Sequence, residues 1–175
     1  TLEGLHQQSS ETPSKHVCVS WFNAEIKNSP NTWISNPNEW LSSVDIENVM
    51  QQYENKHKHF DFLGPSPIDF DEYKKFGQCV WKELCEFNLK DKINENKTKL
   101  GFIFNTDPHY SSGSHWISLF VDIERKFIFY FDSTSDPVPS EIARFIEKVK
   151  TQGHDMTPKI HFKHYENRKA EHQIQ

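Results

Sequence analysis

Hydrophobic residues recur with a helical period in the first half of this chain and in short strand-like runs after residue 99. Over residues 43–55 they fall on one helical face, and Ser42 or Ser43 is placed to cap that helix. A second helix is predicted over residues 69–87, after a sharp break at residues 64–67 (Gly-Pro-Ser-Pro). Residues 90–99 are charged and rich in Asn, so we expect an exposed connection there.

The second half of the chain predicts strands rather than helices. Its aromatic and β-branched runs lie at residues 100–105, 115–122 and 126–132. The three residues between the last two runs have the length of a hairpin turn. Residues 140–150 restore the helical period, and residues 159–163 predict one more strand. Helices followed by three strands, a helix and a strand indicate an α+β domain.

Composition supports one folded domain and argues against several classes of partner. The 175 residues include fourteen Phe and five Trp, enough for one packed core. The net charge of −5 gives no general attraction to nucleic acid or to an anionic membrane. No apolar run approaches the roughly 18 residues that span a bilayer. The three cysteines are too few and too irregularly spaced for a disulfide framework, and they fit a reducing compartment.

Two short histidine pairs raise the question of a metal site. His57 and His59 form one pair, and His161 and His164 form the other. Neither pair is joined by a second pair of ligands at suitable spacing. We therefore predict no metal site and no cofactor.

A histidine opens one predicted strand and an aspartate closes the next. His115 follows a Ser- and Gly-rich loop, and Asp132 ends the run before Ser133. If the two strands pair as a hairpin, both residues lie at one edge of the sheet, within hydrogen-bond reach. The carboxylate would then orient an imidazole that activates a nucleophile. The pattern alone leaves a second interpretation open, in which His115 is a packing or surface residue and Asp132 a turn former.

Two segments carry a resemblance to a known family. The block GSHWISLFVDIERKFIFYFDS (residues 113–133) resembles the His-Trp to Asp-Ser block of papain-like cysteine proteases of the adenain and Ulp1 type. EWLSSVDIENVMQQYE (residues 39–54) is similar to the helix that opens the same fold. With Asn-Thr-Asp at residues 105–107 and His-Gln near the end, the likeness points to the polyprotein-processing proteases of African swine fever virus and other large DNA viruses. It implies a short mixed sheet flanked by helices.

The resemblance also implies the roles of particular residues. His115 would be the general base and Asp132 the residue that orients it. Gln173 would donate a hydrogen bond to the oxyanion, with Gln175 as the substitute if the register differs. Trp40 and Trp116 would wall a narrow slot that admits a Gly-Gly tail and excludes residues with a Cβ.

The same resemblance predicts the organisation of the chain. Residues 1–36 would be an amino-terminal arm, and residues 37–175 a protease core that is incomplete at its C-terminal end. In the family the nucleophilic Cys follows the glutamine closely, whereas this chain ends two residues after Gln173. Cys18, Cys79 and Cys85 do not match that place, so we expect the chain as given to be inactive.

The function implied is a cysteine endopeptidase that cleaves after Gly-Gly in viral structural polyproteins during virion maturation. Its partner would be a polypeptide with a Gly-Gly motif, without nucleic acid or a membrane span. Its place would be the host cytoplasm, at the site of virus assembly, and the virion. Two alternatives stay open: an isopeptidase that removes ubiquitin or SUMO-like modifiers, and a non-catalytic binding module derived from the protease fold.

Overall fold

The structure is a computed structural model that describes residues 40–167. The chain divides between Trp40 and Leu41 into two units, and the described residues after Trp40 all belong to the second unit. The predicted arm over residues 1–36 lies outside the described residues. No helix within residues 40–167 is long and apolar enough to cross a membrane.

A five-stranded mixed sheet lies at the centre of the second unit, and its strands follow one another in the order of the sequence. The strands are β1 (Phe60–Pro67), β2 (Lys99–Asn105), β3 (Trp116–Asp122), β4 (Phe127–Phe131) and β5 (Lys163–Glu166). The central strands β2, β3 and β4 are antiparallel, whereas β1 and β5 each run parallel to their neighbour.

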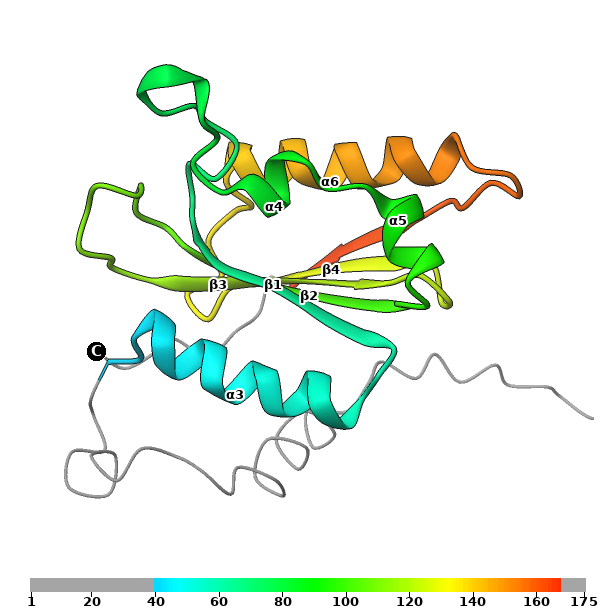
Figure 1. The fold of residues 1–175 in the computed structure, drawn as a ribbon, viewed down its shortest axis with the longest axis horizontal. Coiled ribbons are helices and arrows are strands. Elements are labelled where there is room, and N and C mark those ends of the chain that lie inside the picture. The colour runs from blue at the N-terminus through cyan, green and yellow to red at the C-terminus, as the bar shows by residue number, and fades with distance from the viewer. Residues whose placement is uncertain (1–39, 168–175) are drawn as a thin grey trace, which may run out of the picture. The chain divides into compact units, whose positions relative to one another are not determined.

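Helices cover both faces of this sheet (Figure 1). One face carries α3 (Ser43–Lys56), and the other carries α4 (Lys82–Cys85), α5 (Leu89–Asn94) and α6 (Ser140–His154). The predicted α+β fold with a mixed sheet and flanking helices is therefore confirmed.

Helix α3 begins where the sequence predicts, because Ser42 forms a capping box with Asp45. The Ser42 hydroxyl accepts a hydrogen bond from the Asp45 amide at 3.2 Å, and the Asp45 carboxylate accepts one from the Ser42 amide at 2.9 Å. Ile46 is buried one turn into the helix. Local sequence alone was sufficient to predict this helix.

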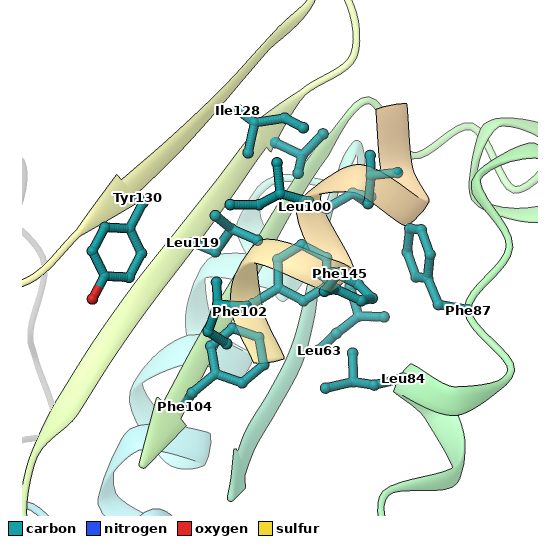
Figure 2. Close-up of a cluster of buried hydrophobic side chains, with 14 of the residues drawn as sticks. Leu63, Leu84, Phe87, Leu100, Phe102, Phe104, Leu119, Ile128, Tyr130 and Phe145 are labelled. Carbon is teal, nitrogen blue, oxygen red and sulfur yellow. The ribbon is translucent and has the colours of Figure 1, made fainter. Parts of the chain in front are cut away.

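The core lies between the sheet and α6, and aromatic rings fill much of it (Figure 2). Alternate residues of β2, including Phe102 and Phe104, are fully buried. The Phe145 ring of α6 meets the Phe102 ring edge-on at a centroid distance of 5.2 Å, and it meets Phe87 at 5.2 Å as well. Each such buried ring contributes about 1.5–3 kcal/mol, so this cluster fixes α6 against the central strands.

The predicted helix over residues 69–87 is wrong. Phe76 and Gly77 have positive φ angles of 75° and 74°, so the chain turns back, and Tyr73 pairs with Cys79 as an isolated bridge. Phe76 is 100% exposed, and Tyr73 is exposed as well. The helical spacing of apolar residues was therefore misleading here, because two members of the supposed buried face lie in solvent. Within this span the structure has the short 3-10 helix η1 (Lys75–Gly77) and the one-turn helix α4.

Cys79 and Cys85 are joined by a disulfide. The sequence predicted no disulfide framework and cysteines that fit a reducing compartment, and it did not anticipate this pair. The pairing brings together two residues six positions apart, and it links the turn after Phe76 to the end of α4. Cys18 lies outside the described residues.

Three smaller predictions also need correction. Residues 64–67 do not break the chain as predicted but continue β1, because a register shift between Leu63 and Ser66 accommodates the prolines. Residues 90–99 include most of α5, which begins at an Asn88 cap. The last strand is β5 rather than residues 159–163, whose apolar side chains pack on the core next to Gly153 of α6.

Candidate active site

The register of the central strands brings the two predicted dyad residues to one edge of the sheet. Asn105 at the end of β2 pairs with Trp116 at the start of β3, and Ser118 of β3 pairs with Phe131 at the end of β4. His115 directly precedes β3 and Asp132 directly follows β4. The hairpin that the sequence predicted is therefore confirmed, and it places both side chains together.

His115 and Asp132 form a short hydrogen bond. His115 Nε2 lies 2.6 Å from Asp132 Oδ1, with side-chain exposures of 23% and 3%. Because the carboxylate accepts the proton on Nε2, Nδ1 is the ring nitrogen left to exchange a proton with a reacting group. Within residues 40–167, Nδ1 of His115 makes no hydrogen bond. The geometry suits a base oriented by a carboxylate.

Thr134 holds the Asp132 carboxylate in its ionised form. The Thr134 amide and its hydroxyl each donate to Asp132 Oδ1 at 2.9 Å. Burial alone would raise the pKa of Asp132, but the hydrogen bonds from His115 and Thr134 outweigh it and hold that pKa below its ordinary value. Asp132 therefore stays negatively charged at neutral pH beside His115.

Tyr130 lies on the same strand two residues before Asp132 and is almost fully buried. Figure 2 shows its oxygen directed away from the hydrophobic cluster. The hydroxyl has no hydrogen-bond partner within the described part of the chain. Burial, with the negative charge of Asp132 added, raises the pKa of Tyr130, so its hydroxyl stays protonated. Sequence reasoning did not single out this residue, whose one signal is its place in an alternating strand.

A network centred on Asn105 builds the loop that leads to His115. Asn105 Oδ1 accepts hydrogen bonds from the amides of Asp107 (2.9 Å) and Ser114 (3.2 Å). The Ser114 hydroxyl donates to Asp107 Oδ1 at 2.9 Å. The Thr106 amide donates to the His115 carbonyl at 2.8 Å. Asp107 thus helps to close the loop against the start of β3.

The same loop is fixed at two further points. Gly113 has a φ of +93°, and a Cβ there would lie 2.8 Å from the Asn105 amide nitrogen, so only glycine fits without strain. His109 forms a second His–Asp pair, with Nδ1 2.6 Å from Asp69 Oδ2, while its amide donates to Asp69 Oδ1 at 2.9 Å. The sequence did not predict this pair, because its members are 40 positions apart.

The two tryptophans predicted to bind substrate differ in how the structure describes them. The Trp116 indole donates from Nε1 to the Leu41 carbonyl at 3.0 Å, which fixes the ring at the N-terminal end of α3. Trp40 is the first described residue and 71% of its surface is exposed. A slot between the two rings stays a prediction.

Part of the predicted site, Gln173 and its substitute Gln175, lies outside the described residues, and so does Cys18. Within residues 40–167 the cysteines are Cys79 and Cys85, which are paired with each other, so this part of the chain offers no free thiol. The same residues hold no group of three or more His, Cys, Asp or Glu side chains placed to bind a metal ion.

Comparison with known proteins gives a consistent result. The family model described as Vaccinia virus I7 processing peptidase matches residues 7–152. A protein from Acanthamoeba polyphaga mimivirus that is named a thiol protease is 35% identical over 114 residues. The match covers 65% of this chain and 36% of that protein. The SUMO-1 cysteine protease of African swine fever virus is 28% identical over 120 residues, covering 64% of this chain and 44% of its own.

A solved structure shares the fold. The crystal structure of the African swine fever virus protease matches with a TM-score of 0.56 at 21% identity, covering 72% of this chain and 48% of that chain. The predicted resemblance to viral cysteine proteases is confirmed. The chain spans less than half the length of the curated relatives it matches.

Proposed function

This chain belongs to the Vaccinia virus I7 processing peptidase family, and on that premise we propose that its protein is a cysteine endopeptidase. We further propose that it cleaves after Gly-Gly in viral structural polyproteins during virion maturation, in the host cytoplasm and the virion. The observation that carries the proposal is the 2.6 Å hydrogen bond between His115 and the buried, ionised Asp132.

The dyad supplies the proton transfers that a cysteine nucleophile needs. Nδ1 of His115 takes the thiol proton, and the thiolate attacks the scissile carbonyl carbon. Asp132 stabilises the resulting imidazolium through Nε2. The imidazolium then protonates the leaving amine, and a water molecule, deprotonated by the same nitrogen, hydrolyses the thioester. Gln173 is proposed to donate to the oxyanion.

The substrate class rests on Trp116 and on glycine chemistry. Trp116 is held in one orientation by its hydrogen bond to the Leu41 carbonyl, so its ring presents a fixed wall. A narrow slot beside this ring would admit two successive glycines and reject any residue with a Cβ. No cofactor takes part in this mechanism.

Labelling by a substrate-like electrophile tests the proposal. The complete coding sequence that contains residues 1–175 is expressed and treated with a peptide ending in Gly-Gly and a thiol-trapping group. Intact mass should show one label, which is lost in His115→Ala and retained in His109→Ala, the matched histidine of the other His–Asp pair. A probe ending in Ala-Ala should label poorly. A folded protein that no Gly-Gly probe labels would overturn the proposal and favour a binding module.

A second candidate function concerns the same chemistry on a different substrate. The African swine fever virus relative is named as a SUMO-1 cysteine protease, which favours an isopeptidase acting on a ubiquitin-like modifier. Competition between a polyprotein-derived peptide and a SUMO carrying the same electrophile separates the two. Faster labelling by the intact SUMO probe than by a probe made from its tail peptide alone would support the isopeptidase.

A further inference from the structure

Asn167 is the residue that follows β5, and it bonds to the end of β4 on both sides of Phe131. Its side-chain Oδ1 accepts a hydrogen bond from the Asp132 amide at 3.0 Å. Its own amide donates to the Tyr130 carbonyl at 3.2 Å. Asn167 thus contacts the main chain of Asp132 directly.

The side chain of Asn167 replaces a strand contact at the point where the sheet ends. The last residue pair between β4 and β5 is Tyr130 with Glu166. Asp132 lies beyond β4, so no residue of β5 accepts a hydrogen bond from its main-chain amide. The amide oxygen of Asn167 fills that role, which an alanine could not do.

Asp132 is consequently held at both ends. Asn167 fixes its main chain, and Thr134 fixes its carboxylate, with both Thr134 bonds on the oxygen that accepts from His115. Since a bond as short as 2.6 Å depends strongly on position, a shift of the Asp132 backbone would lengthen it.

We propose that Asn167 is a positioning residue of the active site, acting on His115 through Asp132. The inference rests on the proposed function.

Proton NMR of the 175-residue chain tests the positioning role without any need for catalysis. Short His–carboxylate bonds give strongly deshielded proton resonances, and the chain has two such bonds, His115 with Asp132 and His109 with Asp69. Asp132→Ala assigns the first signal by removing it. Asn167→Ala should shift that signal upfield or broaden it while leaving the His109 signal in place.

Two further variants separate positioning from a general loss of stability. Asn88, at the start of α5, also has a side chain that accepts hydrogen bonds from main-chain amides. Asn88→Ala should leave both signals unchanged. Asn167→Gln keeps the amide but displaces its oxygen, and should shift the His115 signal by less than Asn167→Ala. An unchanged His115 signal in Asn167→Ala would overturn the inference.

Kinetics of the complete protein give an independent readout. Asn167→Ala should lower kcat by about tenfold at nearly constant KM, whereas Asn88→Ala should change neither. If the wild-type protein shows no peptidase activity, the proposed function fails, yet the NMR comparison still decides whether Asn167 positions Asp132.

Discussion

Two replacements of Asp132 distinguish its two contributions: the hydrogen bond that orients His115 and the negative charge that stabilises the His115 imidazolium. Asp132 Oδ1 accepts three hydrogen bonds, from His115 Nε2 and from the amide and hydroxyl of Thr134. Asp132→Asn keeps an oxygen where these donors meet but removes the negative charge. Asp132→Ala removes both. Asp132→Ala should therefore lose much more activity than Asp132→Asn.

The expected magnitudes follow from the kind of bond lost. A hydrogen bond to a charged group contributes about 1.5–3 kcal/mol, and a neutral one about 1 kcal/mol. Asp132→Asn should thus lose roughly 1 kcal/mol of transition-state stabilisation, or about five- to tenfold in kcat/KM. Asp132→Ala loses the whole interaction, about 3 kcal/mol, which is on the order of 100-fold.

The assay is hydrolysis of a fluorogenic Gly-Gly peptide by the complete protein, with active sites counted by the electrophilic probe. Asp69→Asn is the matched control, because it removes the charge from the other His–Asp pair, whose hydrogen bond is also 2.6 Å long. That control should affect unfolding more than kcat/KM. An Asp132→Ala protein within threefold of wild type would refute the assigned role. Equal losses in both Asp132 variants would show that the charge, not the orientation, dominates.

Three further results are expected from the 175-residue chain itself. Phe102→Ala should lower the free energy of unfolding by about 3–5 kcal/mol in urea titrations, because the ring is fully buried against Phe145; a loss under 1 kcal/mol would contradict this packing. Gly113→Ala should cost about 1–3 kcal/mol through its positive φ and the contact with Asn105, while Gly77→Ala, which has open space, isolates the φ effect. Folding lowers the pKa of Asp132, so the stabilisation from its ionised carboxylate is present above the unfolded pKa of about 3.9 and is lost as pH falls through the folded pKa. The free energy of unfolding of the wild-type chain should therefore fall more steeply with acid than that of Asp132→Asn. Parallel curves for the two proteins would refute this prediction.

Local patterns were sufficient for the parts of the fold that local interactions determine. Helix α3 has its cap and its apolar period within one stretch of sequence. The hairpin of β3 and β4 joins neighbouring strands through a short turn, so its register follows from the chain itself. The approach of His115 to Asp132 could be predicted for the same reason, since the two are 17 positions apart within that hairpin.

The remaining features depend on contacts that no local pattern records. The supposed helix over residues 69–87 had the correct period, but the turn at Phe76 and the pairing of Cys79 with Cys85 determine its path. Asn167 reaches Asp132 across 35 positions, and its neighbours in the sequence give no sign of that contact. An isolated Asn or His is common on any surface, so only the folded chain shows which one is placed to act.

The agreement between strand order and sequence order has a consequence for how the site is assembled during synthesis. Each strand that leaves the ribosome finds its partner already present, as the strand made immediately before it. No strand has to be inserted between two others, and the turn between β3, which ends at Asp122, and β4, which begins at Phe127, is short, which favours rapid formation of this hairpin. The hairpin that bears His115 and Asp132 can therefore form while the later residues are still being translated, and Asn167 is added after it and then bonds to Asp132.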